Sequence, residues 1–231
     1  MMKTLFLQAP SFEGFDGGAG ARYQNRREIK SFWYPTWLAQ PAALVEGSKL
    51  IDAPPHRLGL ADVLPEVKDR DLVVLHTSTP SFASDVKTVR ALKAANPNLK
   101  IGMIGAKVAV DAAGSLAACQ ELDFVARNEF DFTIKEVAEG RDFGSITGLS
   151  YRGRDGRVVH NTDRAMLASP RALGWIGNAG DVGMRPSNQR VRGPVQTSWP
   201  TLSSYVSTNS ASLAAACSAS IAFVRRSISS R

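Results

Sequence analysis

The chain has 231 residues, 44% of them hydrophobic, which is enough to bury the core of one domain of ordinary size. The net charge of +7 lies mostly in residues 168–231, with seven arginines against one acidic residue, so the rest of the chain shows no basic character typical of a nucleic-acid-binding protein. No apolar run reaches the ~18 residues of a membrane span, and no signal peptide is evident. The two cysteines, Cys119 and Cys217, provide no disulfide framework. We therefore expect a cytoplasmic protein without a transmembrane segment.

The first part of the chain predicts two strands, residues 4–8 and 49–52, separated by a long segment and a helix. Residues 9–34 are too long for an ordinary connection, and such a segment is either a functional loop or a surface excursion. Its basic residues are interpreted as a solvated face: Arg22, Arg26, Arg27 and Lys30. A helix is expected to start at Pro35 and to end at Gly47, and residues 60–67 form a second amphipathic stretch.

Residues 71–133 repeat the strand, loop and helix pattern of a parallel sheet. Three apolar runs are expected to be strands covered on both faces: residues 72–75, 101–104 and 124–126. The periodicity predicts an amphipathic helix from Phe82 to Leu92 that stops before Pro97, and a small-residue helix over 112–119. The loops after the three strands should open at one edge of the sheet, where ligands bind in open α/β folds: residues 76–81, 105–107 and 127–130.

The end of this region predicts a helix and a hairpin. Asp131 is expected to cap the helix and Gly140 to end it. Residues 146–152 and 157–161 should form the hairpin. The fold class is therefore α/β, with a five-stranded parallel sheet in the flavodoxin-like order 2-1-3-4-5, a C-terminal β-hairpin, and a cleft between the first and third strands.

Common cofactor motifs are missing from the sequence. Neither a P-loop nor a G-x-G-x-x-G fingerprint is present. The three histidines are far apart and have no metal-ligand spacing, so no metal site is predicted. His76 follows a buried strand and is interpreted as a structural, hydrogen-bonded histidine rather than a ligand.

Several segments carry a resemblance to a known family: residues 72–81, the Gly105 loop after 101–104, residues 123–133, and residues 146–152 with 155–159. They resemble the N-terminal cobalamin-binding domain of B12-dependent radical SAM proteins. Residues 5–23 and 30–41 look like the hopanoid-biosynthesis branch of that family. The resemblance covers roughly residues 2–167.

The resemblance implies a Rossmann-like domain that holds cobalamin across its strand-exit loops. In the family, a partial TIM-type barrel follows and carries a [4Fe-4S] cluster and S-adenosylmethionine. The hopanoid branch is linked to formation of the bacteriohopanetetrol cyclitol ether, a lipid substrate that would bring the protein to a membrane. By position, Thr77, Ser78 and Thr79 would lie at the corrin or its nucleotide tail. Gly105 and Ala106 would allow close backbone approach, and Arg127 and Glu129 would line the third loop. The resemblance places no catalytic residue in this chain.

The catalytic half of that family has no counterpart in this sequence. An iron–sulfur cluster of the C-x-x-x-C-x-x-C type needs three thiolates, and this chain has two cysteines, 98 positions apart. The D-x-H-x-x-G signature that supplies a histidine ligand to cobalamin is also absent. We therefore expect a cobalamin-binding domain over 1–145, a hairpin leading toward the barrel over 146–167, and a Ser/Arg-rich disordered tail over 168–231.

The tail admits two interpretations. It has 13 serines, no lysine and no glutamate, and it shows no family resemblance. Our hypothesis is that the sequence is read out of frame after about residue 167. The alternative is a genuine basic tail that docks on anionic lipid or nucleic acid.

Three functions remain open at this point. The chain could be the cobalamin-binding part of a hopanoid radical SAM enzyme, which would not be catalytic alone. It could be a stand-alone B12 carrier or sensor that works with a separate radical SAM subunit. It could also be a flavodoxin-like interaction module without a cofactor.

Overall fold

The computed structural model describes residues 1–12 and 35–167, all within one compact unit. The predictions for most of the long loop, for its basic cluster and for the tail lie outside the described residues. Within the described part of the chain, no helix is long and apolar enough to cross a membrane.

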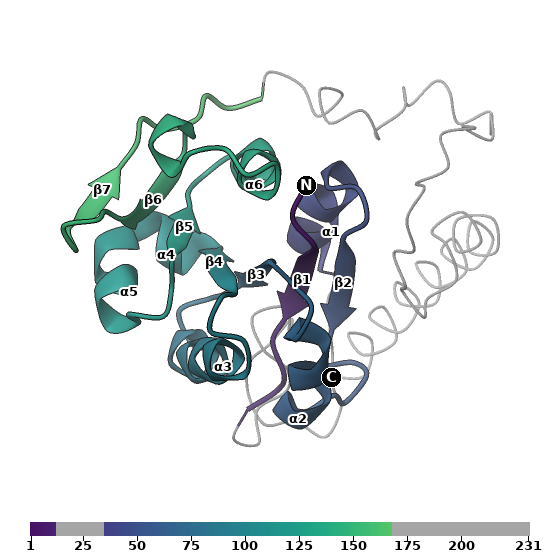
Figure 1. Ribbon diagram of the computed structural model, residues 1–231. Helices are drawn as coiled ribbons and strands as arrows, with labels where there is room; N and C mark the ends of the chain where they lie inside the picture. The colour runs from purple at the N-terminus through teal and green to yellow at the C-terminus, as the bar shows by residue number, and fades with distance from the viewer. Residues whose placement is uncertain (13–34, 168–231) are drawn as a thin grey trace, which may run out of the picture. The chain divides into compact units, whose positions relative to one another are not determined.

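A seven-stranded sheet forms the centre of the fold, in the order β2-β1-β3-β4-β5-β6-β7 (Figure 1). The strands are β1 (Thr4–Gln8), β2 (Lys49–Asp52), β3 (Leu72–His76), β4 (Lys100–Ile104), β5 (Phe124–Ala126), β6 (Leu149–Arg152) and β7 (Val158–His160). The first five strands are parallel, while β6 pairs antiparallel with β5 and with β7.

The five parallel strands follow the order expected from the sequence, but the predicted strand count is too low. The hairpin is part of the same sheet, because β6 pairs along the free edge of β5 with Phe124 opposite Tyr151 and Ala126 opposite Leu149. This pairing satisfies backbone groups of β5 that would otherwise form an open edge.

Helices cover both faces of the sheet (Figure 1). The helical segments are α1 (Thr36–Leu44), α2 (Leu60–Val63), η1 (Leu64–Val67), α3 (Phe82–Ala95), α4 (Ala106–Val110), α5 (Ala112–Ala118), α6 (Phe130–Ala138) and η2 (Phe143–Ser145), with η1 and η2 as 3₁₀ turns. Successive strand residues point to opposite faces. Phe6 accordingly packs with α1 and α6, whereas its neighbours Leu5 and Leu7 pack with α2, η1, α3, α4 and α5.

Two local predictions are wrong. A loop was expected over residues 105–107, but α4 begins at Ala106, directly after Gly105. Asp131 was expected to cap α6, yet Glu129 holds the N-cap position and Asp131 lies buried inside the first turn. The reason is that Phe130 packs against the core from within the helix, which moves the start of α6 towards the strand. Gly140 ends this helix with φ +83°, as expected.

Candidate functional site

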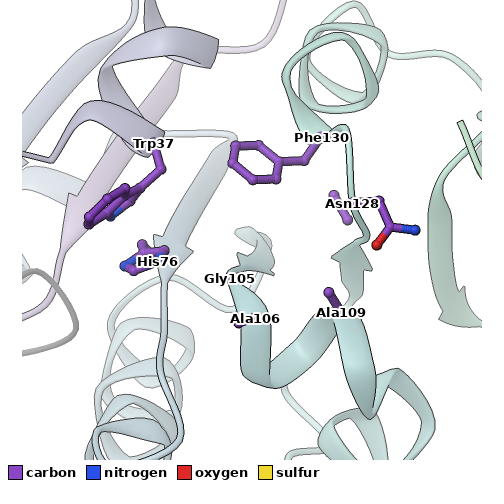
Figure 2. Close-up of a pocket in the computed structure, with 8 residues that line it drawn as sticks. Trp37, His76, Gly105, Ala106, Ala109, Asn128 and Phe130 are labelled. Carbon is purple, nitrogen blue, oxygen red and sulfur yellow. The ribbon is translucent and has the colours of Figure 1, made fainter. Parts of the chain in front are cut away.

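A pocket of about 290 Å³ lies at the carboxyl ends of β3, β4 and β5, with α1 on one side and the start of α6 on the other (Figure 2). The residues that line it are Trp37, His76, Gly105, Ala106, Ala109, Ala126, Asn128 and Phe130. Among the described residues, this lining is mostly aromatic rings and methyl groups and contains no aspartate, glutamate, lysine or arginine. A lining of this kind suits a flat, uncharged group with a few hydrogen-bonding atoms.

The pocket lies at the predicted edge of the sheet but not at the predicted strands. The cleft was expected between β1 and β3. Within the described residues, the lining comes from the ends of β3, β4 and β5, from α1, from α4 and from the turn before α6, and not from β1. The long side chains of Trp37 and Phe130 reach over these strand ends and so enclose space there (Figure 2).

Trp37 and His76 form one wall of the pocket. Their ring centroids are 4.9 Å apart, with the planes inclined by 34°. Burial lowers the pKa of His76 to about 4, so its imidazole is neutral at physiological pH. Within the described part of the chain, the buried Nε1 of Trp37 and Nδ1 of His76 have no hydrogen-bond partner. The expectation of a hydrogen-bonded structural histidine is therefore not met at Nδ1.

An unpaired buried polar atom costs about 1–3 kcal/mol, since it has lost its hydrogen bonds to water. Both atoms belong to rings that form one wall of the pocket, so this wall carries two unpaired polar atoms.

Gly105 holds the turn between β4 and α4 against the end of β3. Its φ is +120° with ψ 165°, a conformation available essentially to glycine alone. A Cβ at this position would lie 2.1 Å from the carbonyl oxygen of Thr77 and 3.2 Å from the His76 ring. Gly105 and the exposed Ala106 thus line the pocket through small groups and backbone. The close approach of a cofactor to them, which the family resemblance implies, stays a prediction.

The other predicted residues after β3 do not line the pocket. The hydroxyl of Thr77 donates to the carboxylate of Asp85 at 2.6 Å, and Ser81 donates to the same oxygen at 2.8 Å. Burial raises the pKa of Asp85 to about 6, although both hydrogen bonds act to lower it. The backbone N–H of Ser78 donates to the Ser81 hydroxyl, and Thr79 is exposed. The loop is therefore tied internally, and its contact with a cofactor stays a prediction.

Arg127 and Glu129 flank the pocket without lining it. The guanidinium of Arg127 is buried and donates to four groups: the Asp163 carboxylate, the Ser150 hydroxyl and the carbonyl oxygens of Leu149 and Asn161. Glu129 occupies the N-cap position of α6. Asn128, which lies between them with φ +51°, is the residue of this turn that reaches the pocket. Cofactor contacts by Arg127 and Glu129 also stay predictions.

The sequence did not single out most of the lining. Trp37 belongs to a helix far from the strand ends in sequence, so no local pattern places it there. Asn128 and Phe130 lie within the predicted third loop but were passed over for their charged neighbours. A search for aromatic residues near each strand exit would have found Phe130.

Two further carboxyl groups outside the pocket have a raised pKa. Burial raises the pKa of Asp52, at the end of β2, to about 7. Burial, with a smaller effect of the Glu129 charge, raises that of Asp131 to about 6. Within residues 1–12 and 35–167, no three His, Cys, Asp or Glu side chains come together as metal ligands.

Comparison with known proteins gives distant likenesses. No protein-family model matches the chain. An uncharacterized methyltransferase of Pyrococcus horikoshii is 31% identical over 152 residues, which cover 62% of this chain and 33% of that protein. The chain thus spans about a third of the length of this relative.

Two solved structures of OxsB, a cobalamin-dependent S-adenosylmethionine radical enzyme, match parts of this chain. The structure with aqua-cobalamin has a TM-score of 0.43 at 16% identity, over 55% of this chain and 20% of that one. The structure with aqua-cobalamin and S-adenosylmethionine has a TM-score of 0.47 at 13% identity, over 71% and 22%. Likeness at this level does not place a ligand in this chain.

Proposed function

We propose that this chain binds a cobalamin at the carboxyl edge of its sheet. The observation that carries the proposal is the pocket of Figure 2, where two buried ring nitrogens without partners stand beside a glycine whose backbone is exposed to the cavity. The resemblance of residues 2–167 to cobalamin-binding domains of radical SAM proteins supports the same assignment. So does the relative named as a methyltransferase, since methyl transfer is one use of cobalamin.

The residues present fit part of such a cofactor. A corrin is flat and carries uncharged amide side chains, which match an apolar pocket with a few polar atoms. About 290 Å³ holds only a portion of so large a molecule, so the remainder would lie across the exposed rim near Ala106 and Asn128. Trp37 and His76 would hydrogen-bond the enclosed portion, and Gly105 would admit it. Bound there, cobalamin would supply a cobalt centre for methyl or radical transfer.

The predicted loop residues take two kinds of role in this proposal. Ser78, Thr79 and Glu129 would contact the part of the cofactor that lies outside the pocket. Thr77 and Arg127 have hydrogen bonds to Asp85 and Asp163, and they would hold the loops in place.

We further propose a specific enzyme context for this domain, which is a radical SAM enzyme of hopanoid biosynthesis. Residues 5–23 and 30–41 carry the resemblance to that branch. The [4Fe-4S] cluster, S-adenosylmethionine and the hopanoid lipid would be bound by protein other than this domain. Detection of a cluster-bearing polypeptide in a pull-down with this chain would favour the stand-alone carrier over a domain of one long enzyme.

The test is direct binding of hydroxocobalamin. The purified 231-residue chain is mixed with an excess of hydroxocobalamin and passed through a gel-filtration column. We expect the corrin absorbance to elute with the protein at close to one equivalent. His76→Leu, which removes the ring that faces Trp37, should reduce the retained corrin several-fold. Elution of the wild-type protein without corrin would instead support the cofactor-free interaction module.

A further inference from the structure

Arg127 is a buried cation whose hydrogen bonds lead away from the pocket. The residue is 9% exposed, and its guanidinium bonds to Leu149 and Ser150 on β6 and to Asn161 and Asp163 beyond β7. Its backbone N–H donates to the carbonyl oxygen of Gly148 at 2.8 Å. Side chain and backbone thus fix Arg127 to a part of the chain more than twenty positions later.

Residues 161–164, here named the return segment, are fastened against this part of the fold. The Asn161 amide donates to the carbonyl oxygens of Phe143 and Ile146 at 2.6 and 2.8 Å. Gly148 donates its N–H to the carbonyl oxygen of Thr162 at 2.7 Å. Arg164 donates to the Thr133 hydroxyl and pairs with the Glu136 carboxylate on α6. The return segment therefore binds both Arg127, directly after β5, and two residues of α6.

The same elements position three of the eight residues that line the pocket. Ala126 and Asn128, the two neighbours of Arg127, line the cavity, and Phe130 lines it from the first turn of α6 (Figure 2). Asn128 keeps a positive φ, which is sparsely populated for a residue other than glycine and persists where the surrounding structure fixes it. Arg127 lies between Ala126 and Asn128 in the sequence, and its guanidinium bonds to the return segment.

We propose that Arg127 is a positioning residue, through which the return segment sets the shape of the ligand pocket. In this role Arg127 does not contact the ligand itself. It holds the turn that presents Asn128 and Phe130, and Asp163 completes its hydrogen bonds from the return segment. The identity of the ligand, cobalamin, rests on the proposed function above. The inference itself concerns how the pocket is shaped, so a second measurement can test it without any ligand.

The test compares Arg127→Met with Lys93→Met in the full chain. Lys93 bonds to the Leu99 carbonyl oxygen at 2.6 Å and to Asp123 at 3.1 Å, at the opposite edge of the sheet. Both substitutions remove a cation that is mostly shielded from solvent and that donates at least two hydrogen bonds. We expect Arg127→Met to weaken hydroxocobalamin binding at least ten-fold, and Lys93→Met to change it less than two-fold, at a temperature where both proteins are folded by circular dichroism. Equal affinities of Arg127→Met and wild type would overturn the inference.

Asp163→Ala separates an effect on ligand affinity from an effect on overall stability. The Asp163 side chain is 62% exposed and does not line the pocket. We expect it to leave the melting temperature nearly unchanged and still to weaken hydroxocobalamin binding about three-fold, since one partner of Arg127 is lost. An unchanged affinity in this variant would contradict the part that the inference assigns to Asp163, since Asn161 would remain as the return-segment partner of Arg127.

Hydrogen–deuterium exchange separates failure of this inference from failure of the proposed function. Without cobalamin, peptides that cover residues 126–131 should exchange at least five-fold faster in Arg127→Met than in wild type, while peptides of β1 should not change. Unaltered exchange would contradict the inference whether or not the wild-type protein binds cobalamin. If Arg127→Met exchanged faster but the wild-type protein retained no corrin, the positioning role would be supported and cobalamin would be rejected as the ligand.

Discussion

Replacement of Gly105 with alanine is expected to destabilise the protein by about 3 kcal/mol or more and to abolish retention of hydroxocobalamin. The added Cβ would lie 2.1 Å from the Thr77 carbonyl oxygen, far inside van der Waals contact. The backbone at φ +120° adds strain of ~1–3 kcal/mol for any residue with a side chain. To relieve the overlap, α4 and the end of β3 must separate, and both carry residues that line the pocket. Urea unfolding followed by far-UV circular dichroism would give the free energy of unfolding.

Gly47→Ala is the matched control for this substitution. Gly47 also has a positive φ, +71°, but a Cβ there would meet no atom within 4 Å. It should therefore show backbone strain alone, about 1 kcal/mol, with hydroxocobalamin binding unchanged. If the two alanine variants lost the same free energy, the close approach of Gly105 to Thr77 would not be the cause.

The parallel core could be predicted from the sequence because its signals are local. Residues 72–75 and 101–104 are short apolar runs bounded by polar or glycine-containing loops, and such runs are typical of buried strands. The start of α4 was missed because its five residues are too few to display a helical period. The pairing of β6 with β5 was missed for another reason: the hairpin pattern defines the turn and not which edge of the sheet receives it.

The site was only partly predictable, because its shape depends on contacts between distant segments. The place of Gly105 at the end of a buried strand follows from the local pattern, whereas a role for it at a site came only from the family resemblance. The pairing of Trp37 with His76 joins residues from α1 and β3, and no spacing in the sequence indicates it. Arg127 was expected to contact a cofactor because the family resemblance places it in the third strand-exit loop. Its partners lie 22 to 36 positions later, and only the folded sheet brings them to the guanidinium.

Asp52→Asn is expected to raise the free energy of unfolding by roughly 2–4 kcal/mol at pH 8 and to have almost no effect below pH 4. Burial raises the pKa of Asp52 from 3.8 to about 7, so the native state holds a proton that the unfolded state releases between these values. Stability from the neutral carboxyl is therefore complete below the unfolded pKa and is lost as the pH rises toward 7. A shift of three units corresponds to about 4 kcal/mol, which is an upper bound here. The amide of asparagine does not ionise, so the variant escapes this loss.

The measurement is the difference in unfolding free energy between the variant and the wild type, in urea, at pH values from 4 to 8. Other groups titrate in this range. Stability from Asp85 and Asp131, with pKa values of about 6, also falls as the pH rises, whereas stability from His76, with a pKa of about 4, is lost as the pH falls below 6.5. These contributions are common to both proteins and cancel in the difference. Asp69→Asn, at a side chain that is 70% exposed, controls for removal of one negative charge and should give a difference that does not grow with pH. A flat difference for Asp52→Asn as well would mean that the end of β2 is solvated in the native state and that Asp52 ionises there without a penalty.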